Sequence, residues 1–250
     1  MEEITLITKA HAKSPVSEAY RTIRTNIQFS QIAGKQLKSI ILTSSFTHEG
    51  KSTTISNLGV VMAQAGKKVV IVDCDLRNPT QHKIFNLENR GVSNCIVTGE
   101  QVEGIIKDSG IANLWVIPAG PVAPNPSELL GSDRMTELLA DLNSRFDYVL
   151  VDTPPVMPVT DACVMASKVD GAVLVLASGE DAPAAVRDAK VRLEQAGAHI
   201  LGVVLNKVDI GYRHSYGYGY GYGYGYGKGY GYYYYPYGED EEKKQDGSDR

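Results

Sequence analysis

The chain has 250 residues, of which 43% are hydrophobic and 22% charged, and its formal net charge is −4. From Gly211 onward the composition changes, which leaves about 210 residues for one domain with a sizeable core. The slightly acidic balance argues against a protein that coats nucleic acid, so no nucleic-acid partner is expected. Cys74, Cys95 and Cys163 form no CxxC pair, which argues against a disulfide framework and favours a reducing cytosol.

No targeting or membrane segment is evident in the sequence. The first residues, MEEITLITK, lack the long apolar region of a signal peptide. The apolar runs are far shorter than the roughly 18 residues of a membrane helix. We therefore expect a cytoplasmic protein that reaches a membrane only through a partner.

Short apolar runs alternate with helical patterns along the chain. The runs are continuously apolar, which is typical of strands covered on both faces of a parallel sheet. An α/β fold with right-handed crossovers is therefore predicted. In chain order we predict a helix over Ser17–Ile32, a strand over Ser39–Thr43, a helix over Lys51–Ala65, strands over Lys68–Asp73 and Leu114–Ile117, a helix over Ser127–Ser144, strands over Tyr148–Asp152 and Ala172–Ala177, a helix over Asp181–Ala196 and a strand over Ile200–Leu205.

The C-terminal tail differs in kind from the rest of the chain. Thirteen of the 15 tyrosines lie at or after Tyr212, and Tyr216–Gly227 is a strict Tyr-Gly alternation. Alternating glycine disfavours a stable helix, and the tail has no aliphatic residues with which to build a core. We predict a disordered appendage, and an incidental low-complexity linker is the alternative.

The segment SSFTHEGKST lies between a predicted strand and a predicted helix. This is the context of a P-loop, in which backbone N–H groups and a helix N-terminus bind phosphate. We predict that Lys51 reaches the β- and γ-phosphates and that the Ser52 hydroxyl ligates Mg²⁺. The first glycine of the usual pattern is replaced by Ser45, and a simple strand–helix turn is the alternative. The nucleotide-binding residues predicted here are Ser45, Phe46, Thr47, His48, Glu49, Gly50, Lys51, Ser52 and Thr53.

Carboxylates end two other predicted strands, in VVIVDCDLR and YVLVDTPP. In a parallel sheet such residues lie on the ligand-binding edge. Asp152 has the position of a Walker B carboxylate that holds Mg²⁺. Asp73 and Asp75 are two residues apart, so in a strand they face the same side and could share a metal and a proton-accepting role. The alternative is that one of them caps a helix or pairs with Arg77.

The last predicted strand runs into LNKVD, which contains the NKxD pattern of GTPases. We therefore predict that Asn206 contacts a purine. The four-residue match does not decide between ATP and GTP.

Together these motifs resemble the bacterial tyrosine kinases (BY-kinases) that regulate capsule and exopolysaccharide synthesis, over nearly the whole chain. SSFTHEGKST is similar to the Walker A motif of that family, VVIVDCDLR to its Walker A′ and YVLVDTPP to its Walker B. PNPSELL resembles a loop and helix common in the family. EAYRTIR resembles its ExxRxxR self-association helix, with Glu18, Arg21 and Arg24 at the matching positions. A solvated helix face is the alternative for these three residues.

The resemblance implies an ATP-dependent protein-tyrosine kinase with a P-loop NTPase-type sheet. It implies that Lys51 stabilises the transferred phosphoryl group, that Ser52, Asp75 and Asp152 organise Mg²⁺, and that Asp73 is the base. The division of roles between Asp73 and Asp75 stays open. The tail would be the autophosphorylated cluster, modified between subunits at Tyr216, Tyr218, Tyr220, Tyr222, Tyr224, Tyr226, Tyr230, Tyr232, Tyr233, Tyr234, Tyr235 and Tyr237.

The resemblance also implies an organisation and a set of partners. Residues 1–38 would carry the self-association helix, 39–210 the kinase core and 211–250 the tail. The expected partners are a ring-like homo-oligomer, a membrane-anchored activator, a tyrosine phosphatase and protein substrates of polysaccharide synthesis. The activator would recruit the kinase from the cytoplasm to the inner face of the cell membrane.

A ParA- or MinD-like ATPase switch is the closest alternative. Those proteins resemble the core but carry a signature lysine in KGGxGK, where this chain has Phe46. They also lack a tyrosine-rich tail, so the sequence favours a kinase. A GTPase is supported only by NKVD.

Overall fold

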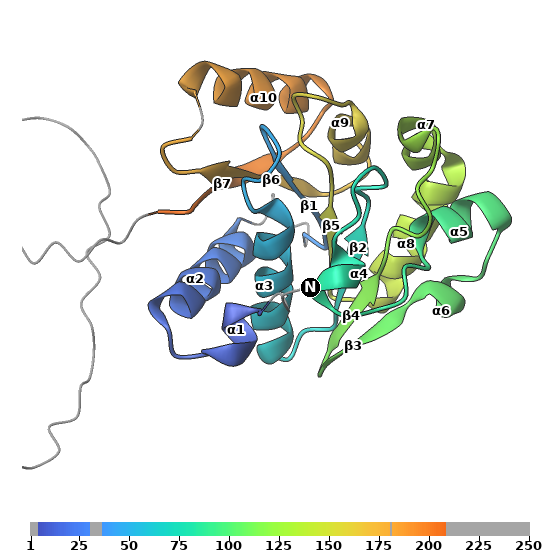
Figure 1. Ribbon diagram of the computed structural model, residues 1–250, viewed down its shortest axis with the longest axis horizontal. Helices are drawn as coiled ribbons and strands as arrows, with labels where there is room; N and C mark the ends of the chain where they lie inside the picture. Colours follow the sequence, from blue (N-terminus) through green and yellow to red (C-terminus); the bar gives the residue numbers. More distant parts are fainter. Residues whose placement is uncertain (1–4, 31–36, 181, 209–250) are drawn as a thin grey trace, which may run out of the picture. The chain divides into compact units, whose positions relative to one another are not determined.

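The computed structural model describes residues 5–30, 37–180 and 182–208, and these belong to one compact unit, Met1–Ile210. They form a seven-stranded sheet with the order β3-β4-β2-β5-β1-β6-β7, flanked by helices (Figure 1). Only β3 is antiparallel to its neighbour, which confirms the predicted mostly parallel α/β fold. The strands are β1 Ser39–Ser44, β2 Val69–Asp73, β3 Lys107–Ile111, β4 Leu114–Ile117, β5 Tyr148–Asp152, β6 Gly171–Ala177 and β7 Ile200–Asn206. The predicted tail tyrosines lie outside the described residues.

The four predicted helices are present, one of them divided in two, and the structure adds five short helices that were not predicted, α1, α4, α5, α6 and α9. The pattern over Ser127–Ser144 forms two helices, because Ser132 leaves the helical conformation with a ψ of 159° and its hydroxyl caps the second by accepting from the Met135 amide. The helices are α1 Ile7–Ala10, α2 Pro15–Phe29, α3 Lys51–Gln64, α4 Gln81–Ile84, α5 Val92–Thr98, α6 Val102–Ile105, α7 Pro126–Gly131, α8 Asp133–Arg145, α9 Asp161–Ala166 and α10 Pro183–Gln195.

Alternate residues of the central strands pack on opposite faces of the sheet. On one face, Ile40 and Leu42 of β1 pack with Leu6, just before α1, and with residues of α2 to α4. On the other face, Ile41 packs with residues of α5 to α10. Ile40, Ile41 and Leu42 are fully buried, as expected for a continuously apolar strand. This packing holds β1, and so the start of the P-loop, rigidly between two cores.

The edge strand β7 departs from the prediction of strands covered on both faces. Val203 and Leu205 are each 56% exposed there. The predicted N-terminal helix, α2, packs mainly against α3, and Arg24 Nη1 donates to the Val61 carbonyl at 3.0 Å. The short α1 joins the same layer, since Thr8 Oγ1 donates to Asn57 Oδ1 at 2.8 Å. Within the described ranges, no helix is both long enough and apolar enough to cross a bilayer.

Candidate active site

The P-loop connects the end of β1 to the first residue of α3, Lys51. Two of its residues have left-handed backbone conformations, His48 with a φ of 66° and Gly50 with a φ of 88°. A Cβ atom at Gly50 would lie 2.1 Å from Asn206 Nδ2. Asn206 Nδ2 also donates to the Glu49 carbonyl at 2.9 Å. The end of β7 therefore contacts the loop directly, which brings the predicted purine contact to the predicted phosphate site.

Glu49 organises the first half of the loop from within. Its carboxylate accepts from the amides of Ser45, at 3.2 Å, and Phe46, at 2.7 Å. The Glu49 residue is only 2% exposed. These two amides are thus engaged within the loop in this arrangement. The amides of the first turn of α3, from Lys51 to Thr53, are the groups placed at the helix N-terminus where a phosphate is favoured.

Lys51 connects the residues that were predicted to organise the metal. Its Nζ lies 3.0 Å from Asp75 Oδ2 and 3.2 Å from Ser52 Oγ. Asp152 Oδ1 is 3.5 Å away. Burial lowers the pKa of Lys51, but the carboxylates of Asp152 and Asp75 outweigh it, and the net pKa is raised above its ordinary value. Lys51 is therefore a fixed positive charge.

Asp73 and Asp75 have different surroundings. Asp73 is fully buried, and its Oδ2 accepts from the amides of Thr80, at 3.0 Å, and Gln81, at 2.9 Å. Burial and the charge of Asp152 raise the pKa of Asp73 to about 7, against the effect of these hydrogen bonds. Asp75 instead lines the cavity over the P-loop. The two carboxylates do not share one side of a strand, because β2 ends at Asp73 and the chain turns there.

Gln81 is a buried site residue that the sequence analysis missed. Its Nε2 donates to Asp152 Oδ2 at 2.7 Å and to the Ser52 carbonyl at 3.2 Å. Its Oε1 accepts from Ser56 Oγ at 2.8 Å. No pattern around Gln81 marks it, since its partners lie on β5 and α3. It fixes one oxygen of Asp152 and connects it to the start of α3.

The remaining oxygen of Asp152 points to a metal role. Asp152 Oδ1 is buried without a hydrogen-bond partner among the described residues, although Lys51 is near. The same part of the chain holds no group of three or more His, Cys, Asp or Glu residues suited to a metal. Mg²⁺ is usually bound by one or two carboxylates together with substrate phosphates and water. The oxygens of Ser52 and Asp152 fit such an incomplete site.

A cavity of about 470 Å³ lies over these groups. The P-loop, the loop after β2 and the loop after β5 all contribute to it. The lining residues are Thr47, His48, Gly50, Lys51, Ser52, Thr53, Asp75, Arg77, Asn78, Thr80, Pro154, Pro155, Pro158 and Val159. Of the two alternatives for these carboxylates, the helix cap is present, since Asp73 accepts from the amides at the start of α4, but Arg77 forms an ion pair with neither Asp73 nor Asp75. Its Nε and Nη2 instead donate to the two oxygens of Asp161 at 2.9 and 3.0 Å.

The predicted self-association residues on α2 do not take part in this site. Arg21 forms an ion pair with Glu18 and donates to the Ala12 carbonyl at 2.8 Å. Arg24 donates to Val61 of α3, as described above. All three side chains therefore make contacts within their own chain, and self-association through them stays a prediction.

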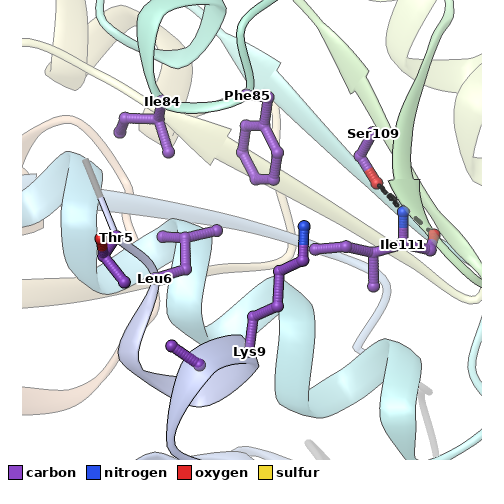
Figure 2. A pocket seen from close by; sticks show the side chains of 8 residues that line it. Thr5, Leu6, Lys9, Ile84, Phe85, Ser109 and Ile111 are labelled. Atoms are coloured by element: carbon purple, nitrogen blue, oxygen red, sulfur yellow. Dashed lines mark hydrogen bonds between the residues drawn. The ribbon is translucent and has the colours of Figure 1, made fainter. Parts of the chain in front are cut away.

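A second cavity, of about 450 Å³, lies between α1, the end of α4 and β3 (Figure 2). Leu6, Phe85 and Ile111 form its apolar walls, and the Lys9 side chain points toward the gap between Phe85 and Ile111. It contains none of the predicted site residues. The cavity over the P-loop is therefore the candidate active site.

A phosphate loop after a central parallel strand, with carboxylates at the ends of two neighbouring strands, defines the class of P-loop nucleotide-binding proteins. A family model described as "AAA domain" matches residues 38–180. The tyrosine-protein kinase YwqD of Bacillus subtilis is 42% identical over 212 residues, 84% of this chain and 89% of YwqD. The tyrosine-protein kinase CpsD of Streptococcus agalactiae is 37% identical over 80% of this chain and 87% of CpsD.

The solved structures agree with these relatives. The crystal structure of the chimerical protein CapA2B2 is 41% identical and covers 81% of this chain and 89% of its own, with a TM-score of 0.78. The chain belongs to the bacterial tyrosine-protein kinase family, and it is an ATP-binding tyrosine-protein kinase. The cell division ATPase MinD of Pyrococcus furiosus is a more distant match, 26% identical over 69% of this chain and 74% of its own, with a TM-score of 0.59. The kinase prediction is confirmed over the ATPase-switch alternative.

Proposed function

We propose that this kinase binds ATP with Mg²⁺ over the P-loop and transfers the γ-phosphoryl group to tyrosines of its own tail, in the control of capsule or exopolysaccharide synthesis. The observation that supports this most strongly is the placement of Lys51. It lies at the N-terminus of α3, between Asp75 and Asp152, and it lines the cavity over the P-loop. The kinship with YwqD and CpsD supports the tyrosine specificity.

The residues of the cavity suit phosphoryl transfer by positioning and electrostatics. A tyrosine hydroxyl has a pKa of about 10 and is a weak nucleophile at neutral pH. The Lys51 ammonium stabilises negative charge on the transferred group. Mg²⁺ held by Ser52 and Asp152, with Asp75 adjacent, would neutralise phosphate charge. The sequence assigned the base to Asp73, but we assign it to Asp75, because Asp75 lines the cavity and Asp73 is fully engaged with backbone amides.

Nucleotide choice and the identity of the base are tested together. The full-length protein is incubated with Mg²⁺ and either ATP or GTP, and phosphotyrosine is measured by blotting. We expect transfer from ATP, loss of transfer in Asp75→Asn, and a normal melting temperature in that variant. Equal transfer from GTP would contradict the donor assignment. Full activity in Asp75→Asn would show that another group acts as the general base.

We propose further that transfer occurs between subunits of a homo-oligomer. A glycine-rich chain of about 30 residues has a root-mean-square reach of roughly 30 Å, enough to meet a neighbouring active site. The test mixes inactive Lys51→Met protein with an active protein whose twelve predicted tail tyrosines are phenylalanine. Phosphate on the Lys51→Met chain is expected. Its absence would mean strict self-modification.

The proposed partners are a membrane-anchored activator, a tyrosine phosphatase and protein substrates of polysaccharide synthesis. The similarity to the chimerical protein CapA2B2 supports the proposal that this kinase works together with a second polypeptide. Through that activator, the kinase would be recruited from the cytoplasm to the inner face of the cell membrane. Co-purification with a membrane fraction only when the activator is present tests this proposal.

A further inference from the structure

The cavity between α1, the end of α4 and β3 has no part in the proposed reaction. Leu6 and Ile84 in its walls are buried, and Phe85 and Ile111 are half-buried. Its volume of about 450 Å³ lies within the range of roughly 300–1,000 Å³ that is typical of small-molecule sites. The walls are therefore apolar enough, and the space large enough, to hold the body of a small organic molecule.

Lys9 supplies the one cationic group among the described residues that line this cavity. Its side chain points toward the gap between Phe85 and Ile111 (Figure 2), and its ammonium forms no ion pair or hydrogen bond with any other residue in the described ranges. The Ser109 hydroxyl is already engaged, because it donates to the Leu114 carbonyl at 2.7 Å and accepts from the Ile111 amide at 3.1 Å. Lys9 is therefore the group that would select the polar end of a ligand.

We propose that this cavity is a regulatory site for a small amphipathic carboxylic acid, whose apolar body packs against Phe85 and Ile111 and whose carboxylate pairs with Lys9. A single ammonium matches one negative charge, whereas a phosphate group is better matched by the fork of an arginine or by several donors. A carboxylic acid with one ring supplies both parts, since the ring can pack on Phe85 edge to face. The ligand would connect α1 to α4 and β3.

The wall formed by α1 is attached to α3, the helix that carries Lys51. Thr8 is fully buried, and its amide and hydroxyl donate to Asn57 Oδ1 of α3 at 3.1 and 2.8 Å. Gln64 Nε2, also on α3, donates to the Thr8 carbonyl at 3.2 Å. Asn57 Nδ2 in turn donates to the carbonyl of Thr53, in the first turn of α3, at 2.9 Å. A ligand that holds α1 in place therefore also supports the start of α3.

The opposite wall is attached to Asp152. Ile84 is the last residue of α4, and Phe85 follows it as the C-cap. Gln81, the first residue of the same short helix, donates to Asp152 Oδ2 at 2.7 Å and to the Ser52 carbonyl at 3.2 Å. The cavity thus lies between two elements that each contact the nucleotide site. Binding of the acid should therefore be coupled to binding of MgATP, and this coupling is reciprocal.

Binding is measured on the intact 250-residue chain with 4-phenylbutyrate as the probe. In an NMR titration with labelled methyl groups, the signals of Leu6, Ile84 and Ile111 should shift, and the same shifts give the Kd. The uncharged amide of the probe should bind about fivefold more weakly, as expected for the loss of one partly exposed ion pair. Shifts confined to the separate apolar groove lined by Val16 and Leu205 would overturn the site.

Two variants test the walls, and a third is the control. Lys9→Met removes the ammonium but keeps a long side chain, and it should weaken binding of the acid about fivefold while leaving that of the amide unchanged. Ala10→Trp fills the cavity from an exposed position and should abolish binding of both probes. Lys13→Met, on an exposed lysine outside the cavity, should change neither Kd. A wild-type Kd for the acid in Lys9→Met, or in Ala10→Trp with a normal melting curve, would overturn the proposal.

The regulatory role is tested by titrating MgATP with and without saturating 4-phenylbutyrate. We expect the Kd for MgATP to fall about fivefold when the cavity is filled. Thr8→Val, which removes the hydroxyl contact with Asn57, should bind the probe but reduce this factor. An unchanged Kd for MgATP in the probe-saturated wild type would overturn the regulatory role. Probe binding that requires removal of residues 1–4 would mean that the chain's own N-terminus fills the cavity, and it would overturn the proposal as well.

Discussion

Replacing Gln81 by leucine tests how the site holds Asp152. Leucine has a similar size but removes the donor at 2.7 Å from Asp152 Oδ2 and the acceptor at 2.8 Å from Ser56 Oγ. Asp152 is fully buried. Its Oδ1 already has no hydrogen-bond partner among the described residues, so the substitution leaves only the Lys51 ion pair to orient the carboxylate.

The size of the effect follows from these contacts. A buried polar group left without its partner costs about 1–3 kcal/mol. For a domain of this size that lowers the melting temperature by roughly 2–12 °C. Loss of a residue that orients a metal ligand typically weakens metal affinity by about 10- to 100-fold. We therefore expect a folded protein whose requirement for Mg²⁺ moves to at least tenfold higher concentration.

The assay is a Mg²⁺ titration of ATP-dependent phosphotyrosine formation, with a thermal melt of each variant. Gln81→Glu is a second variant of the same shape, which places a carboxylate against Asp152 and should shift the Mg²⁺ requirement further. Gln101→Leu is the matched control, on an exposed glutamine outside the cavity. An unchanged Mg²⁺ requirement in folded Gln81→Leu would refute the positioning of Asp152 by Gln81.

Three further predictions concern single residues. Gly50→Ala should weaken ATP binding at least tenfold in a nucleotide titration, because the new Cβ would lie 2.1 Å from Asn206 Nδ2 at a φ of 88°; wild-type affinity would contradict this geometry. Asp152→Asn should raise the Mg²⁺ concentration needed for half-maximal transfer about tenfold, and an unchanged value would make Asp152 purely structural. Asp73 has a folded-state pKa raised to about 7, so the wild type should lose stability as the pH rises toward 7 and then level off. Melting temperatures from pH 4 to pH 8 check this, and an identical pH profile in Asp73→Asn would disprove it.

The strands of this fold could be predicted because most of them are buried on both faces. Such strands need continuous apolar runs, and the predicted bounds of β4 and β5 agree with the structure. The edge strand β3 was missed because its sequence, KDSGI, alternates half-buried and exposed residues and has no apolar run. The break between α7 and α8 was missed because Ser132 acts as a cap inside an otherwise helical pattern.

Some residues of the site could likewise be predicted from the local sequence, whereas others depend on contacts between residues far apart in the chain. Lys51, Asp75 and Asp152 could be predicted because each belongs to a motif next to its own strand. The contact between Gln81 and Asp152 joins residues 71 positions apart, and that between Arg77 and Asp161 joins residues 84 apart. No local pattern contains such pairs. The separate surroundings of Asp73 and Asp75 depend on where β2 ends, and that boundary is fixed by packing.

Mass spectrometry of the full-length chain tests the central claim most directly. Wild-type protein, Lys51→Met and the exposed-lysine control Lys68→Met are incubated with ATP and Mg²⁺, and phosphate is mapped along residues 212–237. We predict phosphotyrosine in the wild type and the control and none in Lys51→Met, which should still fold but melt at a lower temperature because Asp75 and the buried Asp152 lose their ion-pair partner. Phosphotyrosine in Lys51→Met, or ATP hydrolysis by the wild type with no phosphotyrosine anywhere on the chain, would contradict the account.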